Sequence, residues 1–273
     1  MSFVELSNSP HAAGIRPVRI VYRDVGGGEP LVFLHGGWGY GVYPITQQIK
    51  AFKNKVRFII PDRSGYGRST PVSAPMPIDF HQRAAEETLL VLDKLGIQRA
   101  MFWGHSDGAV IAAKIGLTAP ERCERLLLEA FHFEPGKLNS RSFFKQFALH
   151  PEDVKDKMQN LLIADHGKSD DKHKDRWKKV VQRNCRVWLK LAAQSEGPND
   201  DLFDGRLGKL KVPVIFMHGS GDPRTEANEM ARVQRALPRA EMRFVETGRH
   251  SPHSERKSWK QCNETLCEFL AGK

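Results

Sequence analysis

The sequence Gly-His-Ser-Asp-Gly at residues 104–108 places Ser106 between two glycines. An apolar run at 101–103 precedes this sequence, and a small-residue apolar segment typical of a helix follows at 107–117. A serine at such a strand-to-helix turn has a strained backbone that exposes its hydroxyl, and flanking glycines avoid a clash between strand and helix. A plain strand-to-helix turn would not need both glycines. We therefore predict that Ser106 is a nucleophile.

A serine hydroxyl is a poor nucleophile until a base takes its proton, and an acid must orient that base. His250 and Asp222 each follow an apolar run expected to be a strand. The chain order serine, aspartate, histidine is the order found on sheets with a nucleophile at a strand-to-helix turn. We predict His250 as the base and Asp222 as the acid, with Glu129 or Glu134 as the competing acid.

Three other histidines lie near these positions. His253 follows His250 by three residues, and we expect it to pack against or orient the loop that carries the base. His105 and His218 stand at the ends of expected strands and are interpreted as hydrogen-bonded core residues.

Continuous apolar runs predict the strands that position these residues. The runs lie at 31–34, 56–60, 101–103, 126–128 and 212–217, and each precedes a loop rich in Gly, Asp, His or Ser. Such runs are typical of parallel strands buried on both faces. Residues 18–22 instead alternate apolar and basic side chains, and with the glycines at 26–28 they predict an exposed antiparallel hairpin.

Helical patterns alternate with these runs. The segment after Asp79 has capping-box spacing and helical periodicity up to Gly96, and further helices are expected at 107–117 and 254–270. This alternation predicts an α/β fold with a mostly parallel, doubly wound sheet.

The alternation stops between residues 134 and 208, where the pattern predicts three helices and no strand. We expect residues 1–133 and 209–273 to form the core and 134–208 to form an inserted helical cap.

The composition sets limits on environment and partners. The 273 residues are 40% hydrophobic and 27% charged, which excludes collagen-like and disordered classes. No apolar stretch is long enough for a membrane span, and no signal peptide is expected. Four cysteines without a Cys-x-x-Cys pair predict reduced thiols, a cytoplasmic protein and no zinc site. The formal charge of +10 comes from basic residues interleaved with acidic ones, so we expect no nucleic-acid partner.

Taken together, these motifs make the chain resemble the α/β-hydrolase superfamily over essentially its whole length. The resemblance rests on the turn at 35–37, the segment at 62–69, and Ser106, Asp222 and His250, which occur in family order. It implies a serine hydrolase with a helical cap and no metal or organic cofactor. It also implies an oxyanion hole formed by the backbone amides of Gly37 and Asp107. Ser106 stands where dehalogenases and epoxide hydrolases carry an aspartate, which argues against those activities.

Several residues near the motifs have two interpretations. The pocket candidates are Trp38, Phe131, His132 and Phe133, whereas Trp177 and Trp188 are expected in the core. The segment 62–69 is interpreted as a buried turn in which Arg63 or Arg68 ties loops together. The carboxylate of Asp107 either suits the start of a helix or holds a substrate cation.

The sequence therefore predicts a hydrolase that cleaves a small to medium carboxylic ester, or a related acyl compound, through an acyl-enzyme on Ser106. Amide or carbon–carbon bond hydrolysis by the same residues is the alternative within enzymes. A ligand-binding, receptor-like module with vestigial hydrolysis is the alternative from another class. The expected partner is a small-molecule acyl substrate, and neither the physiological substrate nor the oligomeric state follows from the pattern.

Overall fold

One eight-stranded sheet runs through the molecule. The computed structural model describes residues 1–167, 175–197, 199–226 and 228–272. In spatial order the strands are β1 (Ser2–Leu6), β2 (Val18–Gly26), β4 (Val56–Pro61), β3 (Glu29–Leu34), β5 (Ala100–His105), β6 (Cys123–Glu129), β7 (Val214–Gly219) and β8 (Glu241–Val245). All pairings from β4 to β8 are parallel. The predicted α/β fold with a mostly parallel sheet is confirmed.

The antiparallel edge differs from the predicted hairpin. Strand β2 pairs with β1 and with β4, and it makes no ladder with β3, which follows it along the chain. The reason is burial: β3 is apolar and buried at residues 31–34, so it takes a central place between β4 and β5. The alternating pattern of β2 suits the outer position. Strand β1 was not predicted from the sequence, and its side chains are mostly exposed.

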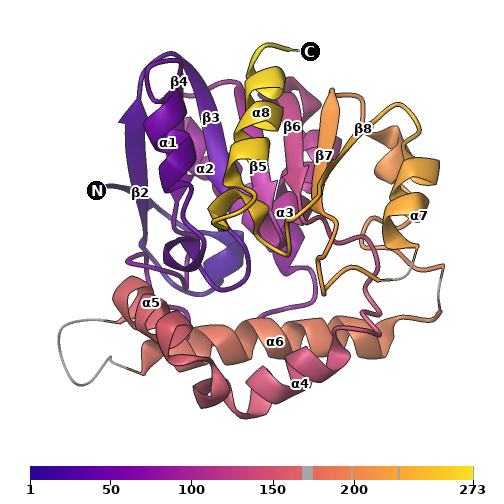
Figure 1. Cartoon of the computed structure of the whole chain (residues 1–273). Helices are drawn as coiled ribbons and strands as arrows, with labels where there is room; N and C mark the ends of the chain where they lie inside the picture. Colours follow the sequence, from indigo (N-terminus) through magenta and orange to yellow (C-terminus); the bar gives the residue numbers. More distant parts are fainter. Residues whose placement is uncertain (168–174, 198, 227, 273) are drawn as a thin grey trace.

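Helices cover both faces of the sheet. They are α1 (Thr46–Phe52), α2 (Phe80–Lys94), α3 (Asp107–Thr118), α4 (Arg141–Leu149), α5 (Asp156–His166), α6 (Arg176–Gln194), α7 (Glu229–Ala236) and α8 (Trp259–Leu270). Helices α1 and α8 pack on one face, and α2, α3 and α7 pack on the other (Figure 1). None of the described helices is long and apolar enough to cross a bilayer.

Two helix starts differ from the sequence prediction. Asp79 precedes α2, but its carboxylate accepts a hydrogen bond from Arg83 Nε at 2.8 Å and does not cap the helix. The last helix begins at Trp259, because residues Pro252–Ser254 form a separate 3-10 turn and the chain is extended at Glu255.

Helices α4, α5 and α6 lie together across the carboxyl ends of the central strands (Figure 1). We call them the inserted helices, and no strand occurs among the described residues between 134 and 208. Side chains of α5 hold this layer to the core: Asp165 accepts the amide of Gly41 at 2.9 Å, and His166 Nε2 donates to the carbonyl of Trp38 at 2.8 Å. Arg176, at the start of α6, donates to the carbonyl of Gly67 at 2.9 Å.

The turn between β5 and α3 requires its glycines. Ser106 has φ 56° and ψ −121°, a strained conformation for a residue with a Cβ. A Cβ at Gly104 would overlap the backbone of Gly108, and a Cβ at Gly108 would overlap the carbonyl of Leu34. Both contacts are to backbone atoms, so no side-chain rotation relieves them.

We expect Gly108→Ala to destabilise the protein by about 3 kcal/mol, the upper end of the usual cost of overpacking, because strand β3 and helix α3 must separate. Urea denaturation measures this difference in unfolding free energy. Gly27→Ala is the control, since a Cβ there has no neighbour within 4 Å. Equal stability of the two variants would contradict the close packing at the turn.

Candidate active site

The fold brings three residues predicted from the sequence into one hydrogen-bonded chain. Ser106 follows β5, Asp222 follows β7 and His250 follows β8. His250 Nε2 lies 3.1 Å from Ser106 Oγ, and His250 Nδ1 lies 2.9 Å from Asp222 Oδ2. This is the arrangement in which a histidine takes a proton from a serine while an acid orients the histidine.

The competing acids lie elsewhere. Glu129 Oε1 accepts His253 Nδ1 at 2.7 Å, and Glu134 pairs with Arg232 at 2.7 Å. Of the three candidate carboxylates, only that of Asp222 contacts His250.

Asp222 is held in its ionised form. Burial alone would raise its pKa, but the charge and hydrogen bond of His250, together with His218, keep the pKa well below the ordinary value. The carboxylate also accepts the backbone amide of Arg224 at 2.9 Å.

The two residues expected to form the oxyanion hole line the same cavity as Ser106. Gly37 and Asp107 both line it, and neither backbone amide has a hydrogen-bond partner among the described residues. Arg63 fixes the first of these turns, because its guanidinium donates to the carbonyls of His35 at 2.5 Å and Gly36 at 3.0 Å. The structure thus supports the interpretation that Arg63 ties loops together.

The cavity beside Ser106 has a volume of about 30 Å³, room for about two water molecules. Its walls come from the core loops and from the inserted helices, and the lining residues are Gly36, Gly37, Trp38, Tyr43, His105, Ser106, Asp107, His132, Phe144, Asn184, Trp188, Arg224 and His250. Trp38 and His132 therefore lie where the sequence analysis expected pocket residues.

Phe131 and Phe133 are corrections to that expectation. Both are buried in the core, where their rings stack on Phe203. The physical reason is alternation: after strand β6 the side chains at 131 and 133 face the core, while His132 between them faces the cavity. Trp177 and Trp188 both belong to the core of the inserted helices, as expected, and Trp188 also borders the cavity.

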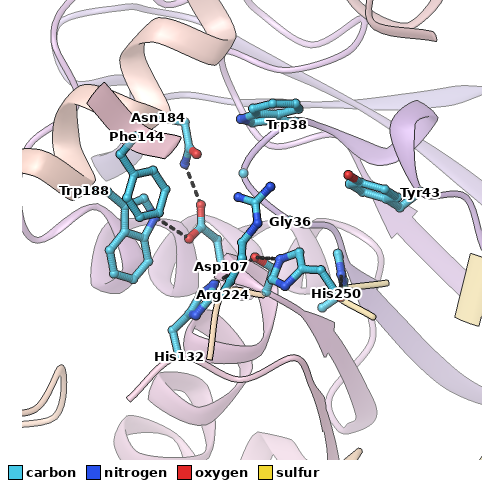
Figure 2. Close-up of a pocket in the computed structure, with 13 residues that line it drawn as sticks. Gly36, Trp38, Tyr43, Asp107, His132, Phe144, Asn184, Trp188, Arg224 and His250 are labelled. Atoms are coloured by element: carbon cyan, nitrogen blue, oxygen red, sulfur yellow. Dashed lines mark hydrogen bonds between the residues drawn. The ribbon is translucent and has the colours of Figure 1, made fainter. Parts of the chain in front are cut away.

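The carboxylate of Asp107 is already fully engaged. It accepts hydrogen bonds from Asn184 Nδ2 at 2.7 Å and Trp188 Nε1 at 3.0 Å (Figure 2). It also accepts one from His81 Nε2 at 3.3 Å. Burial by itself would raise its pKa, but hydrogen bonds from His81 and Asn184 and the charge of Arg63 keep the pKa below the ordinary value. The structure therefore corrects the cation-binding alternative: these donors use both oxygens of Asp107.

Residues 29–257 match the family described as alpha/beta hydrolase fold, which covers more than half of the chain. This chain belongs to that family. By family it is therefore a hydrolase, and the predicted superfamily resemblance is confirmed.

Relatives within the family have different activities. The hydrolase is 28% identical, over 93% of its length and 91% of the relative's, to a 2-hydroxy-6-oxononadienedioate/2-hydroxy-6-oxononatrienedioate hydrolase from Paraburkholderia phymatum. It is 25% identical, over 81% of its length and 83% of the relative's, to a proline iminopeptidase from Neisseria gonorrhoeae. Among solved structures, a thermophilic esterase from Thermogutta terrifontis matches 100% of this chain and 99% of its own with a TM-score of 0.72 and 16% identity.

A second imidazole, that of His132, lies beside Ser106. The sequence predicted His132 only as a pocket residue. His132 Nε2 lies 3.2 Å from Ser106 Oγ, and its ring stacks on that of His250 at 5.6 Å. Burial, and then the charge of Lys137, lower the pKa of His132 well below the ordinary value, so the ring is neutral. Since the single hydroxyl proton of Ser106 is donated to His250, His132 donates its Nε2–H to a lone pair of the same oxygen.

A buried ion pair underlies the loop that carries His250. His253 uses both ring nitrogens as donors, to Glu129 Oε1 at 2.7 Å and to the carbonyl of Tyr43 at 2.9 Å. Burial would lower its pKa, but the charge and hydrogen bond of Glu129 raise it above the ordinary value. His105 Nε2 donates to the carbonyl of His250 at 2.9 Å, and burial lowers the pKa of His105 to about 3.

This cluster groups ligand atoms of His105, Glu129 and His253 within 4.8 Å of one another. A metal needs an unprotonated ring nitrogen from each histidine, and His253 has none to offer because both of its nitrogens donate. The geometry is that of an ion pair which orients the loop, as predicted for His253. His218 also makes the expected hydrogen bond, to Thr225 Oγ1 at 2.5 Å.

Four cavity residues were not anticipated from the sequence: Tyr43, Phe144, Asn184 and Arg224. Arg224 carried a usable signal, since it stands two residues after the predicted acid on the same loop. The other three belong to distant segments with no local motif.

The His253–Glu129 pair makes stability depend on pH. It contributes fully between pH 4.5 and 6.5, the ordinary pKa values of the two groups. Above pH 6.5 the native protein keeps a His253 proton that the unfolded chain has lost, so the contribution of this pair to the free energy of unfolding declines as the pH rises. We expect the difference in unfolding free energy between wild type and Glu129→Gln to decline accordingly, measured by urea denaturation at a series of pH values above 6.5.

Glu124→Gln, on the same strand but partly exposed, is the control and should keep the decline. The buried histidines with lowered pKa values, such as His105, are neutral in the native protein, whereas the unfolded chain releases their protons around pH 6.5. They raise stability with pH equally in both proteins, so only the difference between wild type and Glu129→Gln reports on His253. The same slope in wild type and Glu129→Gln would show that His253 is neutral in the native protein.

Proposed function

We propose that this hydrolase cleaves small carboxylic esters, or similar acyl compounds, through an acyl-enzyme on Ser106. The observation that carries the proposal is the hydrogen-bonded chain from Ser106 through His250 to Asp222, beside a cavity lined by two unpartnered backbone amides. A receptor-like module would not need this complete set of groups.

The geometry supports a two-step reaction. Ser106 Oγ attacks the substrate carbonyl carbon as His250 Nε2 takes the hydroxyl proton, and the amides of Gly37 and Asp107 stabilise the oxyanion. His250 then gives this proton to the leaving oxygen as the carbon–oxygen bond breaks. A water molecule, deprotonated by His250, attacks the acyl-enzyme carbonyl. His250 then gives this proton to Ser106 Oγ as the acyl–oxygen bond breaks, which releases the acid and regenerates Ser106.

His132 assists the first step in this proposal. Its Nε2–H points at the oxygen that becomes more negative as the proton leaves, so it stabilises the developing alkoxide of Ser106. Because the ring is neutral, it adds no second positive charge next to His250 when that residue becomes protonated.

The inserted helices set the size of the substrate. We include residues 134–208 in the proposal as a cap, because Phe144, Asn184 and Trp188 line the cavity beside Ser106. A cavity of about 30 Å³ admits only a short acyl group unless these helices move. The cap would therefore select against long chains.

The second candidate is hydrolysis of an amide or a carbon–carbon bond by the same residues. The relatives named as an iminopeptidase and as a dienedioate hydrolase favour it. Assays that place small amides and diketones beside the esters separate the two candidates.

All four cysteines are free thiols, and three of them are buried. Buried free thiols support the proposal of a reducing, cytoplasmic environment. The proposed partner there is a small acyl substrate.

We expect a fluorophosphonate probe to add once, at Ser106, and Ser106→Ala to remain unlabelled. His250→Ala and Asp222→Asn should each lower kcat for a short-chain aryl ester by about 10⁴-fold, because neither leaves a correctly oriented base. Intact-mass analysis and steady-state kinetics measure these effects. Glu134→Gln is the matched acid control and should retain activity, whereas full labelling of Ser106→Ala would refute the assignment.

We expect kcat/KM to be highest for acetyl or propionyl esters and to fall for longer acyl chains, because the cavity is small. A series of 4-nitrophenyl esters from acetate to decanoate tests this, below and above the concentration at which the long esters form micelles. A rate that rises steadily with chain length into micelles would contradict this size limit.

A further inference from the structure

The cavity is lined by a cationic side chain that the reaction above does not use. Arg224 lies on the loop after β7, and its side chain is drawn among the lining residues near Asp107 and His250 (Figure 2). The guanidinium carbon lies 3.5 Å from the ring centre of Phe143 and 5.9 Å from that of Trp38. Aromatic rings thus flank this cation.

No described residue neutralises this cation directly. Among the described residues, no carboxylate oxygen lies within 4.0 Å of its guanidinium, and no side-chain hydrogen bond is formed by it. Burial lowers the pKa of Arg224, and Tyr43 and Asp222 offset this only in part. Arg224 is only partly buried, and its guanidinium borders the cavity without a carboxylate partner among the described residues.

The two nearby acids are committed to other donors. Both oxygens of Asp222 contact His250 Nδ1, at 2.9 and 3.1 Å, and one of them also accepts a backbone amide. Asp107 accepts three side-chain donors, from α2 and α6. Neither carboxylate is free to turn toward Arg224 without breaking these bonds.

The backbone of Arg224 is fixed on both sides. Its amide donates to Asp222 at 2.9 Å, and its carbonyl accepts Lys137 Nζ at 3.3 Å. Lys137 in turn forms a fully buried pair with Glu229 at 2.7 Å. The loop therefore presents the guanidinium to the cavity from a rigid base rather than from a mobile surface segment.

We propose that Arg224 binds a carboxylate of the substrate, so that the enzyme acts on acyl compounds with an anionic group near the scissile carbonyl. This inference rests on the proposed function, because it places the anion in the cavity beside Ser106. The guanidinium offers a planar set of donors that matches a carboxylate. A cavity of about 30 Å³ favours this small planar group over a tetrahedral phosphate.

The same geometry limits the substrate further. Since Arg224 and Ser106 line one small cavity, the carboxylate and the reacting carbonyl are separated by only a few bonds. Either half of an ester can carry the anion, the acyl part or the leaving group. The experiment therefore includes both arrangements.

Two pairs of isosteric esters test the proposal. Phenyl hemiglutarate is compared with phenyl 4-carbamoylbutanoate for an anion on the acyl part, and 4-acetoxybenzoate with 4-acetoxybenzamide for one on the leaving group. The measured quantity is the ratio of kcat/KM for the charged ester to that for its neutral partner, after subtraction of the uncatalysed rate.

In at least one pair we expect wild type to prefer the charged ester by about 10- to 100-fold, the range for a hydrogen-bonded ion pair. Arg224→Gln should bring the ratio close to one, and Arg224→Lys should give an intermediate ratio. Arg239→Gln removes the same charge from an exposed position and should leave the ratio unchanged.

A binding measurement complements the kinetics. Titration of the charged ester of the preferred pair into Ser106→Ala should give a Kd at least about 10-fold lower than that of its amide partner, and the Ser106→Ala/Arg224→Gln double variant should lose this difference. Circular dichroism and thermal melting verify that the Arg224 variants are folded. If Arg224→Gln fails to fold, the wild-type ratio and Arg224→Lys still decide the question.

The failures of the two proposals are distinguishable. If wild type labels at Ser106 and hydrolyses neutral esters without any preference for a carboxylate, the role of Arg224 is wrong and the hydrolase proposal stands. A preference that persists in Arg224→Gln also overturns it and leaves Arg224 as a packing partner of Phe143. If Ser106 is not labelled and no ester is hydrolysed, the proposed function itself fails.

Discussion

The carboxylate of Asp107 joins the parts of this molecule that meet at Ser106. It belongs to the residue after Ser106 and accepts donors from α2 and from α6, at distances of 2.7 to 3.3 Å. A buried carboxylate must be satisfied by such donors, because leaving it unpaired costs several kcal/mol. This requirement holds α6 over the turn that carries the proposed nucleophile.

The position of α6 then sets the shape of the cavity. Asn184, which binds Asp107, packs so closely on the oxyanion turn that a Cβ at Gly37 would overlap it. Trp188, the other donor from α6, contacts the ring of His132 edge to face. One buried anion therefore couples the inserted helices, the expected oxyanion hole and the second imidazole at Ser106.

Histidines around the site differ in charge because their surroundings differ. His253 has a carboxylate on one nitrogen and a carbonyl on the other, which raises its pKa and keeps it charged. His105 and His132 lie equally deep without a dedicated acid, so burial lowers their pKa values and they stay neutral. The charged residue anchors the loop of His250, and the neutral ones contact His250 and Ser106 without competing for the proton. Members of the family share the fold, but their names describe different activities. Residues around the cavity, such as these histidines, are positions at which members with different activities can differ.

Much of this protein was predictable from local sequence. The glycines around Ser106, the buried strand runs and the order of Ser106, Asp222 and His250 follow from steric and periodic constraints within short segments. Tertiary structure alone decided the rest. Strand β2 pairs with β4 because β3 takes the central place in the sheet. Asp107 accepts a hydrogen bond from Asn184, which lies 77 positions away in the sequence. The cavity position of Arg224 likewise depends on contacts between distant segments, because side-chain surroundings are set by packing that no local pattern encodes.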